Sequence, residues 1–255
     1  MGWMLEDRTI PILETERLTM RFGGLTALNR VNFRMNQGVL WFLIGPNGAG
    51  KTTFFNVVTG KLRPSEGKVR FMGEVITGMS IHEIARKGIG RTFQIPNLFG
   101  NLTVYANIMI AAQKRTRSFN PFSSESKGID RETTEMALKT AGLIEKRNTI
   151  AGSLSHGEKR KLELGIALAL NPKLLLLDEP TAGLNDVETK EMAQLLKQIS
   201  GEISLLVIEH DIEFMREIAE VIMVFHKGTV LAEGSLAEIE QDERVKRVYL
   251  EGVEG

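Results

Sequence analysis

Four residues in the first quarter of the chain have the spacing of a phosphate-binding loop. The pattern G-x-x-x-x-G-K-[ST] is formed by Gly45, Gly50, Lys51 and Thr52. Glycines allow successive backbone N–H groups to face one anion, and the start of a helix adds partial positive charge. In such a loop the lysine reaches the β- and γ-phosphates and the hydroxyl binds Mg²⁺. The pattern predicts a nucleotide site.

The residues around this loop supply the setting that it requires. The apolar run Leu40–Ile44 predicts a buried parallel strand before the loop, and residues 54–58 predict a helix after it. A glycine-rich turn that matches by chance has no reason to lie between a strand and a helix. We therefore interpret residues 40–53 as the part of the chain around which the rest is organised.

Two acidic residues form the second candidate group. Asp178 and Glu179 follow the apolar run Leu174–Leu177, and the C-terminal ends of parallel strands are where open α/β sheets bind ligands. Asp178 is suited to hold Mg²⁺ through its water shell, and Glu179 to orient or deprotonate an attacking water. Alone, the pair is explained equally well as a solvated strand end. Together with a phosphate loop, it indicates the acidic half of a nucleoside triphosphatase site.

A third group, Leu154-Ser155-His156-Gly157-Glu158, comes directly before a predicted helix. Ser155 and Gly157 can offer a hydroxyl and backbone N–H groups to an anion. The same residues also fit an ordinary capping box, with Ser155 at the N-cap and Glu158 three residues later. Both can hold at once, and a second anion-binding helix start makes sense if it serves the nucleotide of a partner subunit.

The elements that must position these groups fall into three zones. Short, mostly antiparallel strands accompany the phosphate loop in the first third, and a mainly helical segment covers about residues 95–170. Apolar strands then alternate with helices up to about residue 234, which predicts a largely parallel sheet covered on both faces. We expect a short helical tail over 235–255 and an insertion-tolerant loop over 115–129.

Composition excludes several classes of protein. The 255 residues include 32 basic and 32 acidic side chains and no cysteine. The balanced charge gives no indication of a nucleic-acid partner, and disulfides and thiolate metal sites are excluded. No hydrophobic run approaches the roughly 20 residues that span a bilayer. The N-terminal residues lack the pattern of a secretory signal, so we expect a cytoplasmic chain.

The ordered set of motifs resembles the ATP-binding subunits of ABC transporters. The set comprises GPNGAGKTT, Gln94, LSHGE, LLLLDEPTAGL and His210 in VIEHD, and the resemblance covers about residues 13–234. It implies one ABC ATPase domain of the α/β class, with a RecA-like P-loop core and an antiparallel β subdomain (about 13–94 and 171–234) and an inserted helical subdomain (about 95–170).

The resemblance also implies a role for each matching residue. Phe22 matches the aromatic that stacks on adenine, and Gln94 matches the Q-loop ligand of Mg²⁺ and water. Glu179 matches the catalytic carboxylate and His210 the switch histidine that contacts the γ-phosphate. Asp178 matches the Walker B acid that binds Mg²⁺ with Thr52, and Ser155 and Gly157 match the signature that caps the γ-phosphate of the opposite subunit. The Walker A loop comprises Gly45, Pro46, Asn47, Gly48, Ala49, Gly50, Lys51, Thr52 and Thr53.

Three positions depart from the family pattern. The usual signature is LSGGQ, whereas this chain has His156 in place of the first of the two glycines and Glu158 in place of the glutamine. The D-loop acid is replaced by Asn185. Glycine and histidine differ in backbone freedom, so the turn has to tolerate a side chain. The acid, the lysine and the switch histidine are all kept, and we expect an active ATPase.

The resemblance further implies ATP and Mg²⁺ as cofactors and several protein partners. These are a second ATP-binding subunit, identical or different, two integral membrane permease subunits and, indirectly, a periplasmic solute-binding protein. The subunit would be peripheral on the inner face of the cell membrane. GRTFQIPNLFGNLTVYANIMIAA and AGLND resemble the branched-chain amino acid and urea uptake group. Lipopolysaccharide-export subunits and ABC ATPases that move no solute are the alternatives.

Overall fold

A six-stranded sheet forms the centre of the computed structural model, which describes residues 10–92, 98–113 and 131–251. The strand order is β10-β9-β3-β8-β7-β6, and all neighbours are parallel except β9 and β10. Every residue of β3, β7 and β8 is buried, because helices or a second sheet cover both faces. The strands are β3 (Leu40–Ile44), β6 (Ile89–Arg91), β7 (Leu174–Asp178), β8 (Ser204–Ile208), β9 (Val221–His226) and β10 (Thr229–Gly234).

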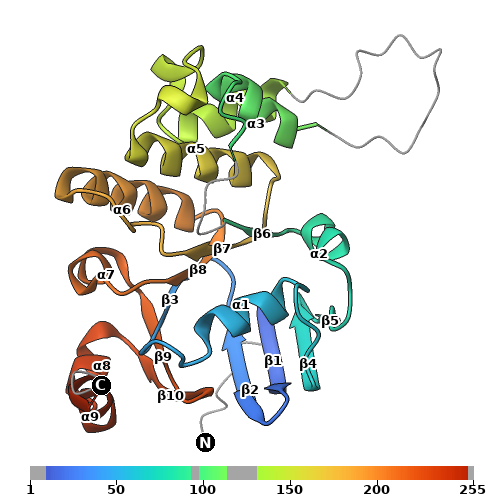
Figure 1. The fold of residues 1–255 in the computed structure, drawn as a ribbon, viewed down its shortest axis with the longest axis vertical. Coiled ribbons are helices and arrows are strands. Elements are labelled where there is room, and N and C mark those ends of the chain that lie inside the picture. The colour runs from blue at the N-terminus through green and yellow to red at the C-terminus, as the bar shows by residue number, and fades with distance from the viewer. Residues whose placement is uncertain (1–9, 93–97, 114–130, 252–255) are drawn as a thin grey trace, which may run out of the picture.

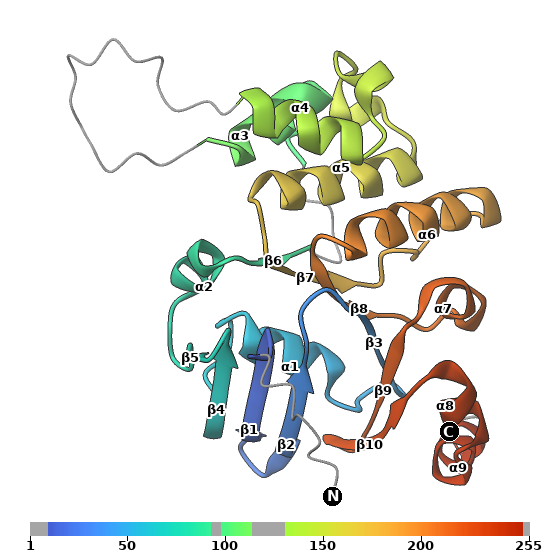
Figure 2. The same cartoon turned by 180° about the vertical axis from the view of Figure 1, so that it is seen from behind.

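A second, antiparallel sheet covers one face of the large sheet, and helix α1 (Lys51–Val58) lies between the two sheets. Its order is β2-β1-β4-β5, and it lies beside α1 in both views (Figures 1 and 2). Phe54 of α1 packs edge-on against Phe33 of this sheet and Phe225 of the large sheet, so α1 is held between the two. The strands are β1 (Leu13–Phe22), β2 (Leu25–Met35), β4 (Glu66–Phe71) and β5 (Glu74–Val75).

Helices cover the other face of the large sheet. A second apolar cluster joins β3, β7 and β8 to α6 (Asp186–Ser200), α7 (Ile212–Ile218) and the C-terminal helices. In α6 the buried residues recur at helical spacing, as one apolar side of an amphipathic helix requires. The chain then ends in α8 (Leu236–Gln241) and α9 (Glu243–Glu251), which pack beside β9 and β10.

A helical region with its own apolar cluster lies beyond α6 (Figure 1). It contains α3 (Val104–Ala111), α4 (Arg131–Thr140), two 3₁₀ turns (Ile144–Lys146 and Ala151–Ser153) and α5 (His156–Ala169). Helix α5 also contributes Leu164 and Ala167 to the cluster under the large sheet, which anchors the region to the core. The short α2 (Ile81–Lys87) precedes β6. None of the helices described is long and apolar enough to cross a membrane.

The fold class predicted from the sequence is confirmed, with differences at several element ends. The alternation of residues 31–35 predicts a strand there, and the structure extends it back to Leu25 as β2, because polar residues of its first half pair with β1. The sequence predicts a helix over residues 158–170, and α5 begins earlier, at His156, because Ser155 caps it directly. It also predicts a helix over residues 104–114, and α3 ends at Ala111. The predicted insertion-tolerant loop at 115–129 and Gln94 lie outside the described residues.

Candidate functional site

The phosphate loop joins β3 to α1 by close backbone approaches that only glycine permits. Gly45 has φ +144, and a Cβ there would lie 2.2 Å from the carbonyl oxygen of Phe225. Gly50 has φ +104, and a Cβ there would lie 2.6 Å from the carbonyl oxygen of Ala27. The N–H of Gly228 donates to the carbonyl of Ala49 at 3.0 Å. Both sheets therefore fix the path of the loop.

Lys51, the first residue of α1, lies back over this loop. Its side chain is buried, and Nζ donates to the carbonyl oxygens of Gly45 (2.6 Å) and Pro46 (3.1 Å). Burial lowers the pKa of Lys51, and the negative charges of Glu179 and Asp178 oppose that fall. A cationic donor thus stands at the mouth of the loop with two carboxylates close to it.

Asp178 ends β7 and is a buried carboxylate. Its Oδ2 accepts from Nη2 of Arg91 at 2.9 Å, and the side chains of the two residues are 6% and 11% exposed. Thr52, by contrast, is exposed on the first turn of α1. A carboxylate and a hydroxyl on neighbouring elements match the oxygen ligands that Mg²⁺ prefers, with waters and phosphate oxygens completing its octahedron. The residues fit a magnesium site, although the described residues contain no cluster of three or more acidic, His or Cys side chains that could hold a metal by themselves.

Glu179 and His210 face each other after β7 and β8. The Oε1 of Glu179 lies 3.1 Å from Nε2 of His210. Glu179 has φ +51, uncommon for a residue with a side chain, and its N–H donates to the carbonyl oxygen of Ile208 at 2.9 Å. Backbone strain of this kind is maintained only where the surroundings fix it. The two side chains predicted to act on the γ-phosphate are therefore close neighbours.

Glu209 joins the segment that follows β7 to the segment that follows β8. Its carboxylate is 3% exposed and accepts from the N–H (2.9 Å) and hydroxyl (2.6 Å) of Thr181 and from the N–H of His210 (3.0 Å). These bonds fix the backbone after β7 to the backbone after β8. The sequence analysis did not single out Glu209. A further acid beside the histidine in VIEHD was the only signal for it.

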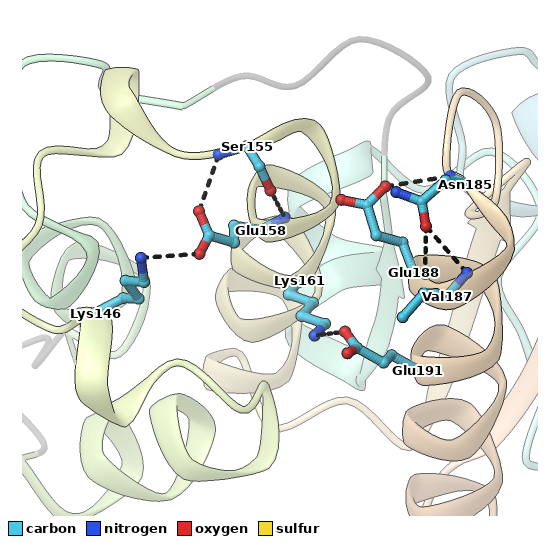
Figure 3. Close-up of polar contacts among 8 residues, drawn as sticks. All are labelled: Lys146, Ser155, Glu158, Lys161, Asn185, Val187, Glu188 and Glu191. Atoms are coloured by element: carbon cyan, nitrogen blue, oxygen red, sulfur yellow. Dashed lines mark hydrogen bonds and ion pairs between the residues drawn. The ribbon is translucent and has the colours of Figure 1, made fainter.

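The start of α5 is closed by the predicted capping box (Figure 3). The hydroxyl of Ser155 accepts from the N–H of Glu158 at 3.2 Å, and the Glu158 carboxylate accepts from the N–H of Ser155 at 2.9 Å. This bond with the backbone, followed by Lys146 at 3.2 Å, lowers the pKa of Glu158 below its ordinary value. Capping boxes accept Glu or Gln at this position, so Glu158 fulfils the local role of the usual glutamine.

The same helix start packs against α6. A Cβ on the buried Gly157 would lie 2.4 Å from Oε1 of Glu188, so a larger residue would have to displace this carboxylate. His156 begins α5 in helical backbone and places Nε2 3.1 Å from the carbonyl oxygen of Ala182. Lys161 and Glu191 add an ion pair between the two helices at 2.5 Å (Figure 3). The histidine is accommodated because this position needs no left-handed backbone.

Asn185 occupies the position of the missing D-loop acid. It is the N-cap of α6, and its side-chain oxygen accepts from the N–H groups of Val187 and Glu188, both at 3.0 Å (Figure 3). Asn and Asp cap helices about equally well. The replacement therefore keeps the local structure while removing a charge.

Two aromatic residues lie at opposite ends of the described chain. Phe22 ends β1 and is 46% exposed, as a ring that stacks on a base must be. Burial raises the pKa of Tyr249 in α9, and a hydrogen bond with the backbone of Gly45 opposes that rise. Tyr249 of α9 therefore contacts the first glycine of the phosphate loop. No sequence motif indicated this contact.

The structure brings part of the predicted site together. Lys51, Asp178, Glu179 and His210 gather around the phosphate loop at the ends of β3, β7 and β8. Ser155 and Gly157 belong to α5, in the helical region, which lies apart from α1 in both views (Figures 1 and 2). The two groups of residues predicted to bind anions are thus separate in the chain.

Comparison with known proteins agrees with this geometry. Residues 28–182 match the family described as ABC transporter. The chain is 40% identical to the high-affinity branched-chain amino acid transport ATP-binding protein BraF of Pseudomonas aeruginosa, over 94% of this chain and 98% of the relative. It is 32% identical to the lipopolysaccharide export system ATP-binding protein LptB of Haemophilus influenzae, over 94% of this chain and 97% of the relative.

Solved structures show the same fold. The ATP-binding cassette MJ1267 of an ABC transporter is 30% identical, with a TM-score of 0.83 over 94% of this chain and 99% of that chain. A dimeric post-hydrolysis state of the cassette MJ0796, bound to ADP and phosphate, is 28% identical, with a TM-score of 0.73 over 88% and 98%. The chain belongs to the ABC transporter family and is one of its ATP-hydrolysing, ATP-binding proteins.

Proposed function

We propose that this chain is the ATPase subunit of an uptake system and drives solute import through two membrane permease subunits. The observation that carries the proposal is the convergence of Lys51, Asp178 and the Glu179–His210 pair on one phosphate loop. ATP and Mg²⁺ are its proposed cofactors. The subunit would be cytoplasmic and bound to the inner face of the membrane through its partners.

Each residue near the loop has a physical role in phosphoryl transfer. Backbone N–H groups of 45–53 and the Lys51 ammonium bind the phosphates, and Phe22 stacks on the base. Mg²⁺, when bound through Thr52, Asp178 and Gln94, neutralises charge on the β- and γ-phosphates. The Glu179 carboxylate orients the attacking water and accepts its proton, because His210 holds its Oε1 in place. His210 then donates to the charge that develops on the transferred group.

Two copies are needed to complete the site in this proposal. Helix α5, whose N-cap is Ser155, lies apart from α1, the helix that follows the chain's own phosphate loop (Figure 1). In a head-to-tail dimer, the Ser155 hydroxyl and the N–H groups at the start of α5 would cap the γ-phosphate held by the partner's loop. The dimeric state of the related cassette MJ0796 supports this arrangement. The second subunit can be identical or a homologue.

A branched-chain amino acid, or alternatively urea or an amide, is the proposed solute. BraF is a branched-chain amino acid transport protein by name, and its identity of 40% exceeds the 32% of the export protein LptB. A periplasmic binding protein would deliver the solute to the permeases. An export role like that of LptB is the second candidate, and an ABC ATPase without a solute is the third.

Replacing Glu179 by Gln tests the proposed chemistry. The variant keeps the hydrogen bonding of the side chain but loses the base, so ATP hydrolysis should fall by about 10²–10⁴-fold. ATP binding should persist, and light scattering with ATP and Mg²⁺ should show a shift from one chain to two. Glu202→Gln, at an exposed site, is the matched control. Near-normal turnover of the Glu179→Gln variant would refute the assigned base.

Uptake assays test the solute. In cells that lack this gene, uptake of radiolabelled leucine or of urea should fall, and wild-type protein but not the Glu179→Gln variant should restore it. A normal rate for both solutes would contradict the proposed import. Accumulation of lipopolysaccharide in the inner membrane would instead favour the export role.

A further inference from the structure

We propose that Arg91 is a positioning residue of the magnesium site and holds Asp178 for the metal. This inference rests on the proposed function, in which Asp178 serves Mg²⁺. Arg91 ends β6, three residues before Gln94. Its hydrogen bonds connect β6 to β7, which carries Asp178, and to α1, which follows the phosphate loop.

Arg91, in β6, contacts residues of two other elements, β7 and α1. Its Nη2 donates to Oδ2 of Asp178 in β7 at 2.9 Å, and its Nη1 donates to Oδ1 of Asn56 in α1 at 2.7 Å. The centre of the guanidinium lies 5.5 Å from the ring centroid of Phe55, also in α1. A rigid fork of donors can make both bonds in one plane, which an ammonium cannot do. The arrangement fixes the guanidinium rather than leaving it to fluctuate.

Strand register explains why Arg91 meets this carboxylate. Arg91 is paired with Leu176 in the parallel β6–β7 ladder. Because side chains alternate along a strand, Leu176 and Asp178 point to the same face as Arg91. That face is the one that α1 covers, since Phe54, Phe55 and Leu176 share one apolar cluster. The arginine therefore reaches along this face to the end of β7, under the helix of the phosphate loop.

The ion pair between Arg91 and Asp178 is buried, and this burial determines its effect on the carboxylate. With 6% and 11% of the two side chains exposed, water screens the pair little. A buried carboxylate without a partner is costly, so Arg91 holds the Asp178 carboxylate in one orientation before a metal arrives. The bond uses Oδ2, and the carboxylate has a second oxygen, Oδ1, for the hydration shell of Mg²⁺. Outer-shell partners of this kind typically change metal affinity by about 10–100-fold when removed.

The test separates metal binding from nucleotide binding. Mn²⁺ is titrated by electron paramagnetic resonance into the full chain with a non-hydrolysable ATP analogue, and analogue binding is measured separately in EDTA. For Arg91→Met, the Kd for Mn²⁺ should rise by about 10–100-fold, while analogue affinity in EDTA should stay within about twofold. Arg91→Lys keeps the charge but not the fork, so its Kd should rise by about threefold to tenfold.

Several outcomes overturn the inference. Unchanged Mn²⁺ affinity in both variants would remove the positioning role, and tighter Mn²⁺ binding would show that Arg91 competes with the metal. An equal loss of analogue affinity in EDTA would indicate general structural support. If Arg91→Met fails to fold, as a melting curve would show, Arg91→Lys decides the question.

Asp178→Asn distinguishes this inference from the function on which it rests. Loss of Mn²⁺ binding in Asp178→Asn but not in the Arg91 variants refutes the role of Arg91 alone. Normal Mn²⁺ binding in Asp178→Asn instead refutes the metal site of the proposed function. Asn56→Leu keeps the ion pair and removes the bond that fixes Nη1. It should weaken Mn²⁺ binding less than Arg91→Met does.

Discussion

The phosphate loop and the start of α5 are the two surfaces that we propose bind anions, and they are built differently. The loop depends on contacts that are distant in sequence, with Phe225 and Ala27 crowding Gly45 and Gly50. The start of α5 depends largely on bonds that span three residues, in the capping box of Ser155 and Glu158. Its contacts that are distant in sequence are with the segment at the start of α6, through Gly157 and Glu188 and through His156 and Ala182. In the proposed dimer, the loop is the preformed half of the site, and the start of α5, which serves the partner's nucleotide, is its presented half.

This difference predicts that variants of the two halves fail in different assays. Damage at the loop should remove nucleotide binding by a single chain. Damage at α5 should spare that binding and impair only steps that need two chains. The following substitutions test the distinction, beginning with the largest expected effect.

Lys51→Ala should have the largest effect on a single chain. It removes a charged donor from the phosphates, and the loss of a charge-assisted bond of up to about 3 kcal/mol corresponds to roughly a 100-fold weaker affinity. The affinity of the monomer for an ATP analogue is the measurement. Lys161→Ala on α5 is the matched control, since Lys161 pairs with Glu191 far from the loop. Equal losses in both variants would erase the distinction between the halves.

Gly157→Ala should have an intermediate effect, confined to the presented half. The added Cβ would lie 2.4 Å from Oε1 of Glu188, so α5 and α6 must separate or the carboxylate must move. Moving the carboxylate weakens its bond with the N–H of Asn185 at the start of α6, so the free energy of unfolding should fall by about 1 kcal/mol. Thermal melting should show the loss, and dimer-dependent hydrolysis should fall while single-chain affinity for the analogue is kept.

Gly201→Ala is the control for this glycine substitution. Gly201 lies at the end of α6, and a Cβ there would meet nothing within 4 Å. It should be neutral or slightly stabilising, because alanine restricts the unfolded chain. If Gly157→Ala melted like Gly201→Ala, the contact with Glu188 would not constrain the signature.

The parts of the structure that could be predicted from the sequence are those that local residue patterns encode. Glycine spacing, apolar strand runs and a capping box each depend on neighbouring residues, so the loop, β7 and the start of α5 were predictable. The partners of Asp178 and Glu209 were not, because they depend on strand order and register, which bring Arg91 to β7 and Thr181 to β8. Tyr249 was missed for the same reason, since its contact with Gly45 joins α9 to a loop that lies far from it in the sequence.

Glu158→Gln should have the smallest effect. It restores the glutamine that the family signature usually has at this position. The glutamine oxygen can accept from the Ser155 N–H as the carboxylate does, so unfolding free energy at pH 7 should change by less than about 0.5 kcal/mol. Glu158→Ala removes the acceptor and should cost about 1 kcal/mol.

The pH dependence distinguishes the glutamate from the glutamine. The folded state lowers the pKa of Glu158 below its ordinary value of 4.5. Its contribution to stability is therefore present above that value and is lost as pH falls through the folded pKa. The Gln variant does not titrate, so its stability relative to wild type should improve below pH 4.5 in melting experiments. A constant difference between the two proteins from pH 7 to pH 3 would show that the capping carboxylate contributes nothing through its charge.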